Sequence, residues 1–307
     1  PTRRTEVQEE IIMKKTLAMM TAAVMVAGAL SGCGSSSSTP AATTAAATEA
    51  ATTAAATEAA TTEAAGDTAA AAEGTVKTPS GKFTVGFDQE FPPMGFVGDE
   101  RQFTGFDLEL AKEVASRLGL EFVPQPINWD AKDMELDSGN IDCIWNGFTM
   151  QGREDDYTWV GPYMAYNQVF VVTADSDIAS KADLAGKAVE VQKDSSGLAA
   201  LQGEAELSAS FGSMTEVADY NTALMDLESG ACDAVCMDSI VAGYQIKSSG
   251  KDMKILDDTL SAEEYGIGFK KGEDELAKAV QDTLMEMKDD GTIAKISNDW
   301  FGSDVFT

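Results

Sequence analysis

Polar side chains gather at four points of the chain where an apolar, strand-like run ends. These segments are Asp88 to Phe91, Asn146 to Thr149, Gln192 to Gly197, and Asp238. They supply carboxylates, amides, hydroxyls, glycines and an aromatic ring, a set that can hold a small polar molecule through hydrogen bonds and charge pairs. If the runs belong to parallel sheets, the segments lie at the sheet edge where ligands of open α/β folds bind.

Several kinds of chemistry are excluded by composition. The 307 residues include no histidine, which removes Ser-His-Asp triads, the usual general base and the usual zinc ligand. We therefore predict no catalytic residue, no metal site and no cofactor. The formal net charge of −29 argues against nucleic acid or an anionic surface as a partner.

The elements that must position these segments alternate between strands and helices from Gly81 to Thr307. Strands are predicted at 82–87, 120–124, 141–145, 168–173, 188–192, 234–237 and 265–269. Helices are predicted from the N-cap Asp107 to Gly119, after Asp130, from Ser196, over 221–229, from Ser239, around 276–287 and near Trp300. Alternation of this kind is typical of an α/β fold with mainly parallel sheets.

A repeated phrase indicates two lobes of one plan. Met134-Glu-Leu-Asp-Ser-Gly-Asn-Ile-Asp142 matches Met225-Asp-Leu-Glu-Ser-Gly-Ala-Cys-Asp233, each a helix, a Ser-Gly stop and the start of a strand. Chance similarity of a common helix–Gly–strand phrase is the alternative. If the two lobes face each other, the four polar segments form a cleft with aromatic walls.

A series of motifs follows one order along residues 81–302. They include Val85-Gly-Phe-Asp-Gln-Glu-Phe-Pro-Pro-Met94, Gly105-Phe-Asp-Leu-Glu-Leu-Ala111, Gly147-Phe-Thr149 with Arg153, Asp233-Ala-Val-Cys-Met-Asp238 and Asp290-Gly-Thr…Trp300-Phe-Gly302. Together they resemble the amino-acid-binding proteins of ABC importers, bacterial extracellular solute-binding family 3 of the polar amino acid type. Two departures stand out: the spacing from Gly147 to Arg153 is one residue shorter than usual in that family, and Asp194 stands where the family often has glycine.

The resemblance implies a type II periplasmic-binding-protein fold: two α/β lobes joined by two crossover strands, Gln168–Thr173 and Tyr265–Phe269. It implies lobe 1 at 81–170 and 263–307 and lobe 2 at 171–262. It also implies roles for the site residues. Arg153 would bind the ligand α-carboxylate, with Thr149, Ser195, Ser196 and Gly197 adding hydrogen bonds; Asp238 would hold the α-ammonium; Gly147 would offer its carbonyl; Asp88 would meet the polar end of the ligand side chain, between Phe91 and Trp129.

Each of these residues has a second reading. Arg153 could pair with Glu154, Asp155 or Asp156 at the surface, and Asp238 could cap the following helix. Asp88 could brace a turn, the two serines could be plain loop, and Phe91 and Trp129 could belong to the core. Asp88 and Glu90 together favour a ligand with a basic or amide side chain.

The N-terminal third indicates export. Lys14 and Lys15 precede an uncharged stretch from Leu17 to Leu30, too short for a membrane span, and Leu30-Ser31-Gly32-Cys33 resembles a lipoprotein lipobox. That resemblance implies a signal peptide at 13–32 and a lipid anchor on Cys33 at the bacterial cell membrane. Residues 1–12 are expected to be untranslated upstream sequence. The codons for Gln8-Glu9-Glu10 can contain a ribosome-binding sequence, which would lie at a suitable distance from a start codon at Met13. Residues 33–80, with their Ala/Thr-rich repeats, are expected to be a disordered linker.

Three cysteines, Cys143, Cys232 and Cys236, remain beyond Cys33, and all are expected to be buried thiols. The chain is thus expected to be a lipid-anchored, extracytoplasmic, monomeric receptor. It would bind a free amino acid by hinge closure and deliver it to an ABC permease and its ATPase. A sensor or adhesin built on the same lobes is one alternative, and neighbouring permease genes would count against it. A dehydratase-like enzyme is another, which turnover of the ligand would reveal.

Overall fold

The computed structural model describes Thr78 and residues 80–307. The expected upstream segment 1–12, the signal peptide 13–32, Cys33 and all of the expected linker except Thr78 and Ser80 lie outside the described residues. Within the described part of the chain, no helix combines the length and the apolar character needed to cross a membrane.

One eight-stranded sheet, in the order β5-β1-β6-β11-β7-β10-β8-β9, organises the described residues, and a small sheet of order β2-β3-β4 lies beside it. The strands are β1 Lys82–Phe87, β2 Glu90–Phe91, β3 Gly95–Val97, β4 Phe103–Thr104, β5 Glu121–Pro126, β6 Cys143–Thr149, β7 Tyr157–Thr173, β8 Ala188–Gln192, β9 Ser213–Val217, β10 Ala234–Asp238 and β11 Met253–Lys270. The seven strands predicted from sequence are all present: β1 and β8 have the predicted ends, and the other five have shifted ends.

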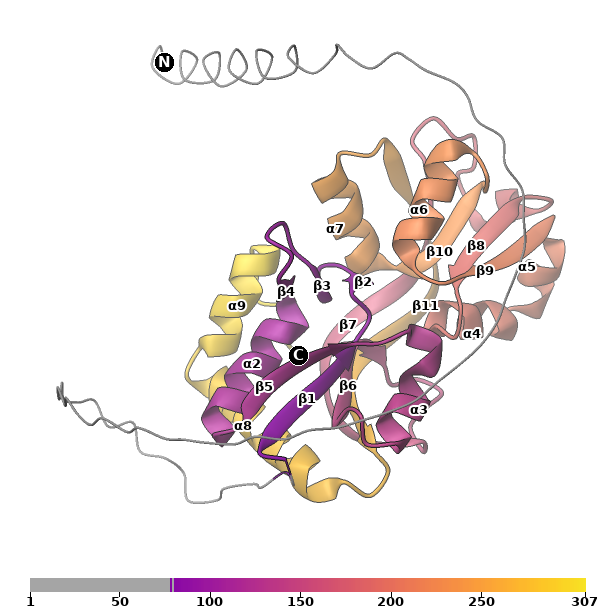
Figure 1. Ribbon diagram of the computed structural model, residues 1–307. Coiled ribbons are helices and arrows are strands. Elements are labelled where there is room, and N and C mark those ends of the chain that lie inside the picture. Colours follow the sequence, from indigo (N-terminus) through magenta and orange to yellow (C-terminus); the bar gives the residue numbers. More distant parts are fainter. Residues whose placement is uncertain (1–77, 79) are drawn as a thin grey trace, which may run out of the picture. The chain divides into compact units, whose positions relative to one another are not determined.

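Parallel ladders lie at both ends of the large sheet. β1 pairs in parallel with β5 and β6, and β8 pairs in parallel with β10 and β9. We call the part built on β5, β1 and β6 lobe 1 and the part built on β10, β8 and β9 lobe 2. The long strands β7 and β11 are antiparallel to each other and connect the two parts (Figure 1). The residue bounds of the lobes, 81–170 with 263–307 for lobe 1 and 171–262 for lobe 2, stay a prediction from the sequence.

Helices cover the sheet on both sides of this junction. They are α2 Phe106–Leu118, α3 Lys132–Asp137, α4 Ser196–Gly203, α5 Ala205–Ser210, α6 Tyr220–Ser229, α7 Ser239–Ser249, α8 Asp274–Asp289 and α9 Thr292–Phe301, with 3-10 turns η1 Trp129–Ala131 and η2 Lys181–Leu184. In Figure 1, α2, α8 and α9 pack together over lobe 1, while α4 and α6 pack against β8 and β10 in lobe 2.

One helix start predicted from sequence is wrong. The N-cap of α2 is Gly105, not Asp107, and Asp107 is fully buried in the first turn. Gly105 has φ 138°, and a Cβ there would lie 2.3 Å from the carbonyl oxygen of Met94, so only glycine fits. Asp107 is thereby free to point its carboxylate into the protein.

The core follows the apolar faces of these elements. Phe83, Val85 and Phe87 alternate with outward positions along β1 and are fully buried. In lobe 2, Val189 and Val191 of β8 pack with Leu198 and Leu201 of α4. The three described cysteines, Cys143, Cys232 and Cys236, are buried free thiols, as expected from the sequence.

Candidate functional site

The predicted site residues gather where the two lobes meet. An inner pocket with a volume of about 10 Å³, room for about one water molecule, lies there. It is lined by Phe91, Trp129, Asn146, Gly147, Thr149, Arg153, Gln192, Ser195, Ser196 and Asp238. The strands deliver most of these residues because β1, β6, β8 and β10 all end at this level, as parallel sheets bring their carboxyl ends to one edge. Of the residues predicted from sequence, Asp88 and Gly197 do not line this inner pocket.

Arg153 projects into the pocket from the loop between β6 and β7. Its guanidinium donates to the carbonyl oxygens of Thr149 at 3.3 Å and Asp194 at 3.4 Å. It lies over the Phe148 ring at 5.1 Å. Among the described residues it makes no ion pair with the acidic side chains next to it in sequence. Its charge therefore remains available for an anionic group in the pocket.

Asp238, at the end of β10, lines the same pocket as Arg153. It occupies the N-cap position of α7, but its side chain makes no capping hydrogen bond there. Instead Oδ1 accepts from Gln168 Nε2 at 3.1 Å, and the residue is only 4 % exposed. Burial, followed by the negative charge of Glu263, raises the pKa of Asp238 to about 7. A buried carboxylate of this kind favours a cationic partner.

The start of α4 adds hydrogen-bonding groups on the lobe 2 side. Ser195 is its N-cap, since its Oγ accepts from Leu198 N at 3.1 Å. The hydroxyl of Thr149 in lobe 1 donates to Ser196 Oγ at 2.9 Å. A Cβ at Gly197 would lie 3.0 Å from Gln168 Oε1, so close packing rather than pocket lining explains the glycine. The free amides of a helix start suit an anion such as a carboxylate.

A glycine turn in β6 is held by a carboxylate from α2. Gly147 has φ 57°, and a Cβ there would lie 2.8 Å from Phe91 Cε1. Its amide donates to Asp107 Oδ2 at 2.7 Å, and Tyr163 Oη donates to the same oxygen at 2.8 Å. Burial raises the pKa of Asp107 to about 7. Asp107 thus helps to set the backbone of the pocket.

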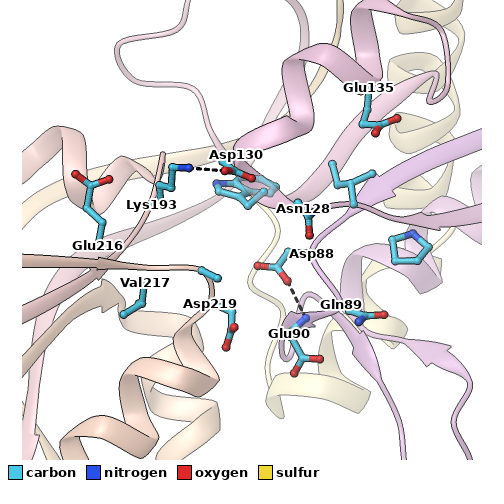
Figure 2. Close-up of a pocket in the computed structure, with 14 residues that line it drawn as sticks. Asp88, Gln89, Glu90, Asn128, Asp130, Glu135, Lys193, Glu216, Val217 and Asp219 are labelled. Atoms are coloured by element: carbon cyan, nitrogen blue, oxygen red, sulfur yellow. Dashed lines mark hydrogen bonds and ion pairs between the residues drawn. The ribbon is translucent and has the colours of Figure 1, made fainter. Parts of the chain in front are cut away.

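A larger outer chamber, with a volume of about 790 Å³, lies next to the inner pocket and shares Trp129 with it. Asp88, 6 % exposed, reaches into this chamber in Figure 2. Its Oδ1 accepts from Glu90 N at 2.9 Å, so it does brace a turn, and its Oδ2 accepts from Gln192 Nε2 at 2.7 Å. Burial raises the pKa of Asp88 to about 6.

The charge of the outer chamber is strongly negative. Its carboxylates are Asp88, Glu90, Asp130, Glu135, Glu216 and Asp219. The lysine among its lining residues, Lys193, extends from lobe 2 and pairs with Asp130 of lobe 1 at 2.6 Å (Figure 2). Five carboxylates therefore face the chamber with no lysine or arginine of the lining left for them.

Further contacts hold the two lobes together around the pocket. Lys132, 2 % exposed, forms an ion pair with Asp194 and also lies over the Trp129 ring at 5.3 Å. Asp194 adopts φ 56°, the left-handed region that accounts for glycine being frequent at this position in the family that the motifs resemble. Asn221 of lobe 2 donates to Glu90 of lobe 1. Contacts between the two lobes thus lie beside the residues that line the pocket and the chamber.

Comparison with known proteins agrees with this arrangement. A sequence model of the bacterial extracellular solute-binding proteins, family 3, matches residues 83–303. The chain belongs to this family. The L-cystine-binding protein TcyJ of Escherichia coli strain K12 is 32 % identical over 231 residues, which cover 73 % of this chain and 84 % of that protein. The L-cystine-binding protein TcyA of Bacillus subtilis strain 168 is 33 % identical over 229 residues, 73 % of this chain and 83 % of that protein.

Solved structures of family 3 proteins share the fold. An ABC uptake transporter substrate-binding protein from Streptococcus pneumoniae, with bound histidine, superposes with a TM-score of 0.72 at 32 % identity, covering 74 % of this chain and 95 % of that one. An ancestral arginine-binding protein bound to arginine gives a TM-score of 0.68 at 35 % identity, covering 72 % of this chain and 98 % of that one. The expected type II periplasmic-binding-protein fold, with two α/β lobes joined by crossover strands, is confirmed.

Sequence reasoning missed several polar residues of this family 3 pocket. Asn146 and Gln192 line it, and both stand at strand ends that the alternation had marked. Tyr166, Gln168 and Glu263 lie behind it on β7 and β11 and are buried. The sequence carried a signal for two of them, because Tyr166 and Gln168 are polar residues at the start of the apolar run Val169–Thr173. Among residues 78 and 80–307 no cluster of side chains suits a metal ion.

Proposed function

We propose that this protein is an extracytoplasmic receptor for an amino acid whose side chain ends in a cationic, amide or zwitterionic group. The observation that carries the proposal is that Arg153, Asp238 and the start of α4 line one pocket. A guanidinium and helix-start amides suit a carboxylate, and a buried carboxylate suits an ammonium, the two groups that an amino acid carries on one carbon. Thr149 and Ser196 would add hydrogen bonds to the carboxylate, and the carbonyl of Gly147 would accept one from the ammonium.

The outer chamber would hold the distal end of the ligand. Its lining carries an excess of carboxylates, so a guanidinium, ammonium or second amino acid head would be favoured there over an anionic group. Asp88 and Gln192, hydrogen-bonded to each other between the two spaces, would contact that end of the ligand, flanked by Phe91 and Trp129. The relatives named as L-cystine-binding and the ancestral protein bound to arginine support both kinds of ligand.

Binding would proceed by closure of the two lobes on the ligand. Ligand groups that touch Arg153 in lobe 1 and Asp238 in lobe 2 at the same time stabilise only the closed form. The inner pocket is too small for an amino acid, so the lobes must separate before entry. We infer that the closed form, a monomer anchored by lipid on Cys33, delivers the ligand to an ABC permease.

The proposal is tested by thermal shift of the refolded protein against the twenty amino acids plus cystine, ornithine and citrulline. A ligand at 100 times its Kd adds about 2.7 kcal/mol to the free energy of unfolding, which raises the melting midpoint measurably. Arg153→Ala should abolish the shift while leaving the ligand-free midpoint within a few degrees. A Lys251→Ala variant, which alters a lysine far from the pocket, serves as control. Wild-type affinity in Arg153→Ala would refute the site.

We propose that the ligand leaves unchanged. One similar solved structure is described as an ancestral amino acid-binding protein that is a precursor of cyclohexadienyl dehydratase, so the fold also supports catalysis. Catalysis here would need a general acid beside the ligand, and Asp88 and Asp238 are the buried carboxyl groups at the two spaces that would hold it. Mass spectrometry of the ligand after overnight incubation with stoichiometric protein should recover it intact, and a dehydrated or decarboxylated product would favour the enzyme.

A further inference from the structure

Two buried carboxylates, one in the wall of the inner pocket and one behind it, share a hydrogen-bond donor. Asp238 of β10 and Glu263 of β11 are 4 % and 7 % exposed, and Gln168 of β7 lies between them. Gln168 Nε2 contacts Asp238 Oδ1 at 3.1 Å and Glu263 Oε2 at 3.4 Å. One amide group therefore links a residue of the pocket to a residue of a connecting strand.

Glu263 is held by hydroxyl groups as well. Tyr166 donates to Glu263 Oε2, and Ser261 donates to Oε1 at 2.6 Å. The same Tyr166 hydroxyl lies 2.7 Å from Thr149 Oγ1 in the pocket wall, and its ring stacks on Tyr265 with centroids 4.0 Å apart. Glu263 is therefore fixed in place by the groups that surround the pocket, although it does not line the pocket itself.

The groups that face this pair form no ion pair with it. Tyr166 on β7, Tyr265 on β11, Cys236 on β10 and Tyr220 on α6 lie around Asp238. Arg153 is the cation that lines the inner pocket with Asp238 and a neighbouring surface pocket with Glu263, and its guanidinium hydrogen-bonds to backbone carbonyl oxygens rather than to either carboxylate. Neither carboxylate belongs to an ion pair among the described residues. Two ionised carboxylates that share one amide group, both buried and without an ion-pair partner, would be unfavourable.

We propose that Glu263 is a positioning residue that keeps a proton on Asp238 while the closed pocket holds no ligand, and that the ligand ammonium displaces this proton to solvent. The proposal rests on the proposed function, because it needs a ligand that carries an ammonium. The ammonium brings one positive charge to Asp238 and one proton leaves, so the charge buried beside Glu263 stays constant. Ligand binding and proton release are then linked reactions.

The direction of the Asp238 shift agrees with this assignment. Burial first, and the charge of Glu263 second, raise its pKa to about 7. At pH 6 binding should release a large fraction of a proton per ligand, and this release should fall as the pH rises above the pKa of Asp238. Between pH 5 and 6 the affinity should rise about tenfold, because deprotonation of Asp238 becomes easier.

Calorimetric titration with L-arginine, and with L-cystine if arginine does not bind, measures the proton directly. Heats at pH 6 in phosphate and in Bis-Tris, buffers of different ionisation enthalpy, give the number of protons released. Glu263→Gln should release clearly fewer protons and show a flatter affinity profile, while affinity at pH 8 stays within about threefold. Glu264→Gln, a neighbour on the opposite face of β11, should behave as wild type. Heats that do not depend on the buffer, or equal release in Glu263→Gln, would overturn the proposal.

A measurement without ligand separates this proposal from the receptor function. A carboxyl whose pKa is raised on folding stabilises the protein below pH 4, and that stability is lost as pH rises to about 7. The melting midpoint of the wild type should therefore fall more between pH 5 and 8 than that of Asp238→Asn, with Glu263→Gln in between. If no amino acid binds but the variants differ from the wild type in this way, the proposed receptor function is refuted, whereas the proposed protonation of Asp238 is supported. An identical pH dependence of the melting midpoint in all three proteins would refute the proposal that Asp238 holds a proton.

Discussion

The carboxylate of Asp107 and the backbone amide of Gly147 are joined by a hydrogen bond of 2.7 Å across 40 residues of sequence. It links the first turn of α2 to the turn of β6 that lines the inner pocket. Tyr163 donates to the same oxygen at 2.8 Å, so β7 also takes part. The pocket backbone of lobe 1 thus depends on a side chain that lines neither the inner pocket nor the outer chamber.

Replacing Asp107 should separate its two contributions, the hydrogen bonds and the charge. Asp107→Asn retains an acceptor oxygen, whereas Asp107→Ala leaves a buried amide and a buried hydroxyl without partners and should lower the free energy of unfolding by about 2–4 kcal/mol. Because burial raises the pKa of Asp107 to about 7, its contribution to stability falls as pH rises from about 4 to 7. Asp107→Asn should flatten that slope. Urea titrations at pH 5 and 8 measure both the loss of hydrogen bonds and the pH dependence. Equal free energies of unfolding for Asp107→Asn and Asp107→Ala would contradict the expected contribution of the hydrogen bonds.

Gly147→Ala should damage the site more than the fold. The residue has φ 57°, and the new Cβ would lie 2.8 Å from Phe91 Cε1 and 3.1 Å from the Tyr265 ring. We expect a loss of about 1–3 kcal/mol in stability and at least tenfold in ligand affinity, since the Phe91 wall must move. Gly139→Ala, also at positive φ but with open space around it, is the matched control. Affinity loss equal in both variants would assign the effect to backbone strain alone.

The parts of this fold that sequence could predict are those with strong local patterns. β1 and β8 were found with correct ends, because alternating or continuous apolar residues mark a buried strand. β9, Ser213–Val217, was missed because it is an edge strand with exposed, mostly polar residues. The long β7 and β11 were predicted only over Gln168–Thr173 and Tyr265–Phe269. Their other parts pair with each other and mix buried with exposed residues, so no continuous apolar run marks them.

The site was predictable where ligand chemistry selects the residue, and not where folding decides it. Arg153 and Asp238 stand in recognisable motifs, and both line the pocket. Gln168 was marked only as a polar residue at the start of an apolar run, and Glu263 matters through its position in a crossing strand, which no local pattern encodes. Asp107 was read as a helix cap because an acid before an apolar helical stretch usually caps it. The tertiary hydrogen bond to Gly147 overrides that preference.

The ion pair of buried Lys132 with Asp194, whose side chain is 49 % exposed, should control closure. Lys132 belongs to lobe 1 and Asp194 to lobe 2, so the pair exists only when the lobes meet. Lys132→Met keeps the packing on Trp129 but removes the charge, and it should weaken ligand affinity about ten- to a hundredfold by destabilising the closed form. Lys193→Met removes the exposed pair with Asp130 and should cost threefold or less. Small-angle scattering with and without ligand would show whether the Lys132 variant stays open; equal affinities of both variants would refute the distinction.

Asp88 should decide which ligand side chains are accepted. It stands between the inner pocket and the acidic outer chamber, hydrogen-bonded to Gln192 across the cleft. Asp88→Asn keeps an oxygen for Glu90 N but removes the charge, so arginine or another cationic ligand should lose about ten- to a hundredfold in affinity. The affinity for a ligand with a neutral amide side chain should change by threefold or less.

The selectivity should also depend on pH. Since burial raises the pKa of Asp88 to about 6, the preference of the wild type for cationic ligands should fall as pH drops from 7 to 5, and Asp88→Asn should lose this dependence. Competition titrations of arginine against glutamine at both pH values measure the ratio, and an unchanged ratio in Asp88→Asn would show that the charge of this residue does not set specificity.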